Sequence, residues 1–183
     1  MIEADMMTRT VKPLLRRFAA RDDGTVAPEV ALWMPLFLLL IVSAIELGTI
    51  TIRHTVLERA LDQTVRDVKL GTGPTTHAGM KTAICDAARV LPGCEETLHL
   101  EMLPLDMSEW SNPPASADCV DVSEAINPQR QFQNGGGGQI MFLRACYKFR
   151  PVTPIGSLNA SLAKDDNGYT ALVSSSAFVN EPG

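Results

Sequence analysis

The sequence predicts an α+β protein, in which a long N-terminal helix spans a membrane and continues as a stalk before a small domain with antiparallel strands. Three observations predict this fold: an apolar run near the N-terminus, helical periodicity directly after it, and strand-like alternation in the later segments. The 183 residues leave room for one anchor and one small domain. We expect a basic leader over 1–24, the transmembrane helix and stalk over 25–73, and the α+β domain over 74–183.

The predicted anchor runs from Val30 to Ile52, where the only charged residue is Glu46. At about 1.5 Å per residue, this segment spans roughly 34 Å, enough to cross the hydrocarbon core of a bilayer. Its Leu, Ile, Val and Phe residues contribute about −4 to −8 kcal/mol to insertion, which outweighs a cost of about 3 kcal/mol for one buried acid. The alternative is the buried core helix of a soluble protein, although such helices rarely run this long without a polar face.

The charges on either side of this run predict its direction. Five basic residues precede it, which keeps the N-terminus in the cytoplasm and places residues 53–183 outside, in the periplasm of a Gram-negative cell. A cleaved secretory signal is disfavoured because the apolar run is too long and no small-x-small site follows it. Acidic residues dominate from residue 95 onward and the net charge is −5, which argues against nucleic-acid binding. The five basic residues are Arg9, Lys12, Arg16, Arg17 and Arg21.

A processing motif stands immediately before the apolar run. Gly24 is followed five positions later by Glu29, at the cytoplasmic end of the predicted anchor. With this motif, the segment from Arg17 to Gly73 resembles the N-terminal region of TadE-like proteins, which are minor pilins or pseudopilins of tight-adherence (Flp-type) pilus systems. Three further stretches also fit that family: Ile45-Glu46-Leu47-Gly48, Arg66-x-x-Lys69-x-Gly71-Thr72-Gly73 and the terminal Asn180-Glu181-Pro182.

The resemblance implies cleavage after Gly24 by a prepilin peptidase, which leaves Thr25 as the mature N-terminus and Glu29 as its fifth residue. In an assembled fibre, the Glu29 carboxylate would neutralise the α-amine of a neighbouring subunit; the plainer alternative is an acid that complements the helix dipole. Two positions depart from the family pattern: Val30 stands where an aromatic residue is usual, and Pro28 where an aliphatic one is. The implied partners are the inner membrane, the prepilin peptidase, other pilin subunits and the pilus assembly platform.

Two residues inside the span stand out as candidates for helix packing and assembly. Pro35 removes one backbone hydrogen bond, so we expect a kink that aids packing between helices or is structural only. Glu46 lies about six residues from the outer end of the span, where it can snorkel or pair with Arg53 on the same helix. We favour a contact with a partner over proton chemistry, because no second buried titratable group lies nearby.

Beyond the membrane, the periodicity predicts a helix that continues to Gly71, so that anchor and stalk together make a rod of about 40 residues. A second helix is expected over 76–91, and strands over 96–103, 139–153 and 168–180, with a long irregular stretch over 106–138. The stalk residues with helical spacing are Ile52, Val56, Leu57, Ala60, Leu61, Thr64, Val65 and Val68. Those of the second helix are Met80, Ile84, Ala87, Ala88 and Leu91.

The four cysteines, Cys85, Cys94, Cys119 and Cys146, favour two disulfides, because an even count in an exported segment indicates oxidised pairs. Three pairings are possible. We favour Cys85–Cys94, which ties the second helix to the following strand, and Cys119–Cys146, which pins the irregular stretch to the long strand. A zinc site is the alternative, but the sequence has no C-x-x-C pair.

No catalytic constellation emerges from the sequence, so we expect no enzyme activity, cofactor, metal or small-molecule substrate. The glycine run at 135–138 lacks the lysine, the hydroxyl residue and the helix of a phosphate loop and is interpreted as a flexible loop. His54, His77 and His99 have no metal-ligand spacing. A second functional hypothesis is an uncleaved, signal-anchored envelope protein whose periplasmic domain binds a ligand or a partner.

Overall fold

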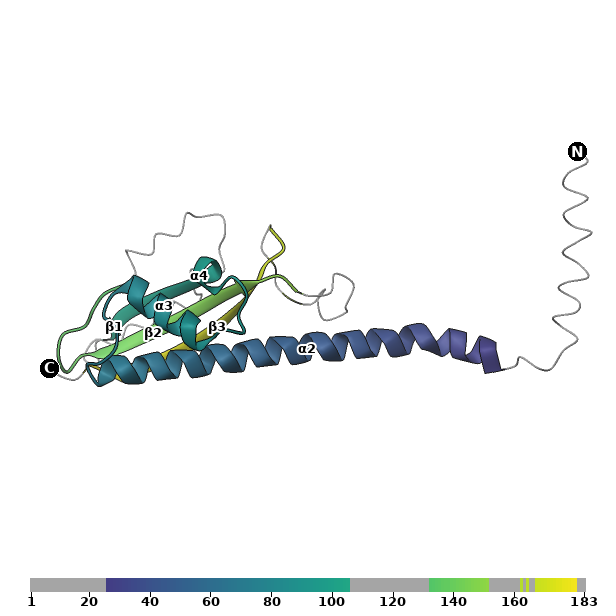
Figure 1. The fold of residues 1–183 in the computed structure, drawn as a ribbon, viewed down its shortest axis with the longest axis horizontal. Helices are drawn as coiled ribbons and strands as arrows, with labels where there is room; N and C mark the ends of the chain where they lie inside the picture. Colours follow the sequence, from purple (N-terminus) through teal and green to yellow (C-terminus); the bar gives the residue numbers. More distant parts are fainter. Residues whose placement is uncertain (1–25, 106–131, 152–161, 163, 165–166, 181–183) are drawn as a thin grey trace, which may run out of the picture. The chain divides into compact units, whose positions relative to one another are not determined.

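The computed structural model of the protein describes residues 26–105, 132–151, 162, 164 and 167–180. The fold is α+β, as predicted: a long apolar N-terminal helix precedes a small domain with three antiparallel strands and short helices (Figure 1). Contacts between residues divide the chain into a unit that ends at Val42 and a second unit from Ser43 to Gly183. In chain order the elements are α2 (Val26–Lys69), α3 (His77–Ala87), α4 (Cys94–Thr97), β1 (Leu98–Leu105), β2 (Ile140–Phe149) and β3 (Thr170–Val179).

Helix α2 has 44 residues, close to the predicted length. Arg66 and Lys69 lie in its last turn, where positive charge complements the helix dipole. The helix ends at the predicted glycine: Gly71 has a φ of +70°, a conformation that costs glycine little, and its N–H donates to the Val68 carbonyl at 3.0 Å.

The C-terminal half of α2 forms part of the domain core. The helical spacing of apolar residues from Ile52 to Val68 predicted one buried face. Most of these residues are buried or partly buried, and Ile52, at 56% exposed, is the exception. They belong to one cluster with alternate residues of β2, which point to the same side of the sheet. The stalk is therefore a structural element of the second unit. On the faces that meet in this core, the buried residues of α2 are Leu57, Ala60, Leu61, Thr64 and Val65, and those of β2 are Met141, Leu143, Ala145, Tyr147 and Phe149.

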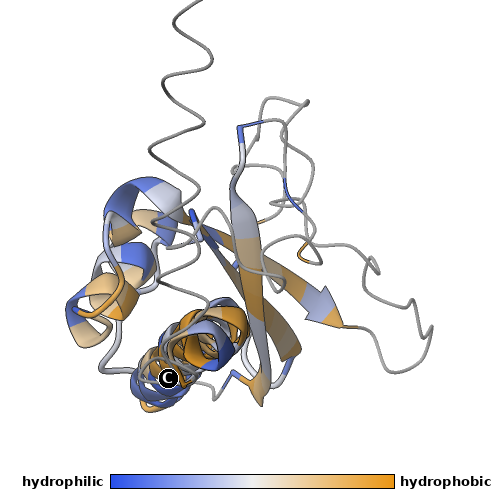
Figure 2. Ribbon diagram, turned by 90° about the vertical axis from the view of Figure 1, so that its right-hand side faces the viewer, coloured by the Kyte–Doolittle hydropathy of each residue, from blue (hydrophilic) through white to orange (hydrophobic). Residues whose placement is uncertain are grey.

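The three strands form an antiparallel sheet in the order β1-β2-β3, with the helices on one of its faces (Figure 2). In the register, Leu98 pairs with Tyr147 and Ile140 pairs with Val179. The strand predicted over 96–103 begins and ends two residues later, because the short helix α4 takes up residues 96 and 97. The later strands lie inside the predicted 139–153 and 168–180; residues 152 and 153 are outside the described part of the chain.

The second helix is shorter than predicted. Its start is held by Thr76, whose hydroxyl accepts a hydrogen bond from the Gly79 N–H at 3.1 Å. It ends at Ala87, four residues before the predicted end, and Ala87 is exposed although the spacing placed it on the inner side. A tighter turn follows, in which the Leu91 N–H donates to the Ala88 carbonyl at 2.9 Å, so that Leu91 is still buried.

A buried ion pair crosses β1 and β2 on the face of the sheet opposite the core. Glu101 and Arg144 are opposite each other in the register, and their side chains approach to 3.3 Å while about nine-tenths of each is buried. The Arg144 guanidinium also lies 5.0 Å from the centre of the Phe142 ring. The residues alone did not reveal this pair, because the cross-strand register that places opposite charges together was unknown.

Candidate assembly site on the N-terminal helix

The first part of α2 presents apolar side chains to its surroundings on every side. All residues from 26 to 41 are exposed, and they include the large side chains of Trp33 and Phe37, which are 64% and 60% exposed. A surface of this kind is unfavourable in water and favourable in lipid or against other apolar helices. Among the described helices, α2 is the one that is long and apolar enough to cross a membrane.

Glu29 stands at the start of this apolar surface. It is exposed in the first turn of α2, where the free N–H groups of the helix favour a negative charge. A shallow apolar depression runs from Glu29 along one side of the helix. Sequence reasoning missed its aromatic members, although the spacing of four between Glu29, Trp33 and Phe37 places them on one face. The depression is lined by Glu29, Val30, Trp33, Met34, Leu36, Phe37 and Leu40.

Three more residues were predicted to belong to the processing motif or to the membrane span: Gly24, Thr25 and Pro35. Gly24 and Thr25 lie outside the described residues. Pro35 lies inside α2, which continues past it, so the missing hydrogen bond does not end the helix.

Glu46 is buried, with 1% of its surface exposed, whereas its neighbours Ile45 and Leu47 are 58% and 52% exposed. It belongs to the second unit of the chain, which begins at Ser43. Glu46 is therefore buried within this chain, and its contact with a partner stays a prediction. Hydropathy alone did not reveal this, because it does not tell where along an apolar helix the folded domain begins.

Arg53 and His54, the two residues of α2 that directly follow Ile52, contact the sheet. The Arg53 guanidinium lies 4.9 Å from the centre of the Phe149 ring in β2. The His54 imidazole lies 3.4 Å from the carbonyl oxygen of Val173 in β3, and 3.5 Å from the Glu58 carboxylate. These contacts attach α2 to the end of the sheet at which β3 begins.

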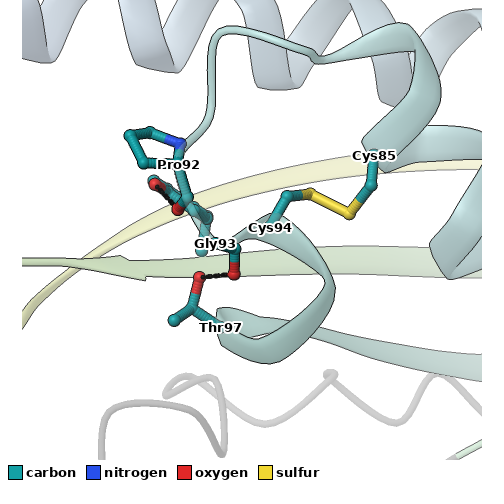
Figure 3. Close-up of a disulfide and its surroundings, with 6 residues drawn as sticks. Cys85, Pro92, Gly93, Cys94 and Thr97 are labelled. Carbon is teal, nitrogen blue, oxygen red and sulfur yellow. Dashed lines mark hydrogen bonds between the residues drawn. A yellow bond between two sulfur atoms is a disulfide. The ribbon is translucent and has the colours of Figure 1, made fainter.

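A disulfide links the two small helices α3 and α4. Cys85 in α3 and Cys94 at the start of α4 form a disulfide, the pairing that the sequence favoured, and both residues are almost fully buried (Figure 3). Next to it, the Thr97 hydroxyl donates to the Gly93 carbonyl at 2.9 Å and closes the short helix. Cys146 in β2 is also disulfide-bonded; Cys119 lies outside the described residues.

Two of the three histidines, His77 and His99, are partly buried in the domain. Burial, followed by the charge of Lys81, lowers the pKa of His77, and its ring meets the Phe132 ring edge-on at 5.1 Å. Burial also lowers the pKa of His99, with smaller contributions from nearby lysines. Among the described residues, no group of three or more His, Cys, Asp or Glu side chains is arranged to hold a metal.

The glycine run at 135–138 forms a turn with several hydrogen bonds, and its flexibility stays a prediction. The Gly136 N–H donates to the Gln139 side chain at 2.8 Å, and the Asn180 side chain donates to the Gly135 carbonyl at 2.9 Å. The Gly138 N–H donates to the Asn180 carbonyl at 2.7 Å. These amides therefore hold the beginning of β2 next to the end of β3.

These features define a membrane-anchored protein with a long apolar helix and a disulfide-containing α+β domain. Residues 24–66 match the family model described as TadE-like protein. The matched segment begins at Gly24 and covers the apolar part of α2 and most of its buried half. This match agrees with the family resemblance stated from the sequence. No curated protein and no solved structure matches the chain.

Proposed function

We propose that the protein is a minor pilin or pseudopilin that takes part in the assembly of a tight-adherence (Flp-type) pilus. In this proposal a prepilin peptidase cleaves the chain after Gly24 at the cytoplasmic face of the inner membrane. The helix then holds the mature protein in the membrane with its domain in the periplasm, until the helix leaves the lipid and packs against the helices of other pilin subunits.

One observation carries this proposal: the TadE-like segment begins at Gly24 and runs directly into a helix whose first sixteen residues are exposed and mostly apolar. From Val26 to Leu47 the helix is about 33 Å long, which matches the hydrocarbon thickness of a bilayer. Lipid tails and neighbouring helices are both apolar, so transfer of this surface from the membrane into a fibre changes little of its hydrophobic stabilisation. A helix that is apolar on every side thus suits both environments.

Glu29 has a defined role in this proposal. After cleavage the chain would begin with the charged α-amine of Thr25, which has to be neutralised once it leaves the membrane surface. The Glu29 carboxylate lies at the same end of the helix, beside Trp33 and Phe37, so a neighbouring subunit that packs into the apolar depression would bring its own α-amine close to this carboxylate. A charge pair in apolar surroundings would fix the register between the two helices.

The disulfide supports a periplasmic place for the domain. Disulfides persist in oxidising compartments such as the periplasm and are rare in the cytosol. With the domain outside and the basic leader inside, the chain follows the positive-inside rule.

Complementation tests the proposal. A deletion strain that carries the wild-type gene, or a Gly24→Ala variant that retains a small residue, should form surface fibres in equal number. A Gly24→Trp variant should form none while the protein accumulates in the membrane, because the bulky side chain blocks the peptidase. Full fibre formation by Gly24→Trp would instead favour an uncleaved, signal-anchored envelope protein with a partner-binding periplasmic domain.

A further inference from the structure

The outer edge of β1 is covered by a short piece of chain at residues 132 and 133, which we call the edge segment. Phe132 forms a parallel bridge with Met102, and the Gln133 N–H donates to the Met102 carbonyl at 3.0 Å. Phe132 also packs against the core cluster of the domain. Because β1 stands at one end of the order β1-β2-β3, the edge segment shields backbone groups that would otherwise face solvent.

His77, the first residue of α3, contacts the edge segment. Its ring meets the Phe132 ring edge-on, with the ring centres 5.1 Å apart. The same side chain hydrogen-bonds to the backbone of Leu100 in β1. The imidazole therefore lies where α3, β1 and the edge segment meet.

The surroundings of this imidazole suit its neutral form. The Nε2 atom of His77 is buried and has no hydrogen-bond partner among the residues that the structure describes. Protonation places an N–H on both ring nitrogens, so the cation has a buried donor at Nε2 without an acceptor. A positive charge is also unfavourable in the first turn of a helix, where the free N–H groups already carry partial positive charge.

The groups that interact electrostatically with His77 are themselves basic. Lys81 lies one turn later on α3, and its charge favours a neutral imidazole. On β1, His99 is close enough to interact with His77, and its pKa is lowered by burial and then by the charges of Lys148 in β2 and Lys81. A proton on His77 therefore enters an environment that is already positive.

The acid of β1 does not offset these cations. Glu101 is paired with Arg144 at 3.3 Å, on the face of the sheet opposite the core. The edge segment itself carries no charge. Burial, and after it Lys81, accordingly lowers the pKa of His77, although the hydrogen bond with the backbone acts in the opposite direction.

We propose that His77 is a pH-sensitive latch, which keeps the edge segment on β1 while its imidazole is neutral and releases that segment when acid protonates it. Release separates the Gln133 N–H from the Met102 carbonyl and removes the Phe132 ring from the imidazole, so the outer edge of β1 opens to solvent. In the periplasmic location proposed above, the domain meets the pH of the medium, because water-filled porins let small ions cross the outer membrane. Only this last step rests on the proposed function; the latch itself follows from the contacts of His77.

The direction and the size of the pH effect follow from proton linkage. In the released state the imidazole has its ordinary pKa of 6.5, and in the latched state its pKa lies below this value. The released state therefore binds more protons as the pH drops below 6.5. The equilibrium constant for opening rises by at most about tenfold for each pH unit, until the latched imidazole is protonated as well.

Amide hydrogen exchange at Gln133 measures the release. The full-length protein, isotope-labelled at its glutamines and purified in detergent, is followed by NMR, and each exchange rate is divided by the intrinsic rate at the same pH. We expect the opening constant of the Gln133 amide to rise several-fold, and at most about tenfold, between about pH 7.5 and about pH 5.5. Gln63 lies inside α2 and reports global unfolding, so it should exchange far more slowly than Gln133 at each pH.

Two variants separate His77 from the other titrating groups. His77→Gln stays neutral across this pH range, so the opening constant of Gln133 should become nearly independent of pH. His99→Gln is the matched control, because it removes the neighbouring histidine and leaves His77 in place; it should keep the response of the wild type.

Phe132→Ala tests the linkage in reverse. This change removes the ring contact, so the pKa of His77, followed by NMR of its ring, should rise toward 6.5. Opening of Gln133 that does not change with pH, an unchanged pH response in His77→Gln, or exchange of Gln133 as slow as that of Gln63 would each overturn the inference. These measurements involve neither cleavage nor fibres, so their failure leaves the proposed pilin function to its own test.

Discussion

Replacement of Leu57 by alanine tests whether the C-terminal half of α2 is part of the domain core. Leu57 has 0% of its surface exposed and lies in the cluster that joins α2 to the sheet. Loss of a fully buried leucine side chain removes its burial energy and leaves a cavity, which together cost roughly 2–5 kcal/mol. For a chain of this length, about 2–4 °C of melting temperature are lost per kcal/mol, so we expect a decrease of roughly 4–20 °C.

Thermal unfolding of the full-length protein in detergent, followed by near-UV circular dichroism, measures this decrease. Leu70→Ala is the matched control, because Leu70 follows the last residue of α2 and is 62% exposed. It should melt within about 2 °C of the wild type, as surface substitutions usually do. If Leu57→Ala melts with the wild type, or if both variants lose stability equally, the stalk is not a core element and the reasoning fails.

Three further predictions concern the domain. The double variant Cys85→Ser/Cys94→Ser should lose about 2.5 kcal/mol of unfolding free energy in denaturant titrations, the loop-closure value for a separation of 9 residues; an unchanged midpoint would contradict this. Arg144→Met should cost about 3–5 kcal/mol, because it removes the positive charge that lies 3.3 Å from the buried Glu101 carboxylate, and adding Glu101→Gln should restore part of the loss. Burial lowers the pKa of His99 in the folded protein, so on acidification the unfolded chain takes up the proton first, near pH 6.5. The free energy of unfolding should therefore fall as the pH drops below 6.5. In His99→Gln it should fall less steeply, and urea midpoints measured across this pH range check the difference.

The sequence predicted the parts of the fold that depend on local pattern. The apolar run, the helical spacing of Leu57, Ala60 and Leu61, and the glycine after the stalk gave a rod of nearly the observed length. These features follow from periodicity and from the conformational freedom of Gly71, which need no knowledge of the tertiary structure. The Cys85–Cys94 pairing was favoured because it ties the second helix to the following strand, and the two cysteines are 9 residues apart in sequence.

What depends on long-range packing was not predictable. Glu46 lies in an apolar run, and only the tertiary structure shows that the domain encloses it. The Glu101–Arg144 pair requires the register of two strands that are 43 residues apart in sequence. The early end of α3 and the short α4 result from a tight turn before Pro92, which periodicity does not encode. The contact between His77 and Phe132 likewise emerges only from the tertiary structure.

The mature N-terminus tests the central claim most directly. Protein purified from the membranes of cells that produce the complete pilus system can be digested and its N-terminal peptide sequenced by mass spectrometry. The account predicts a chain that begins at Thr25, followed four residues later by Glu29 in the first turn of α2. A protein that retains residues 1–24, or that begins at any other residue, would contradict it.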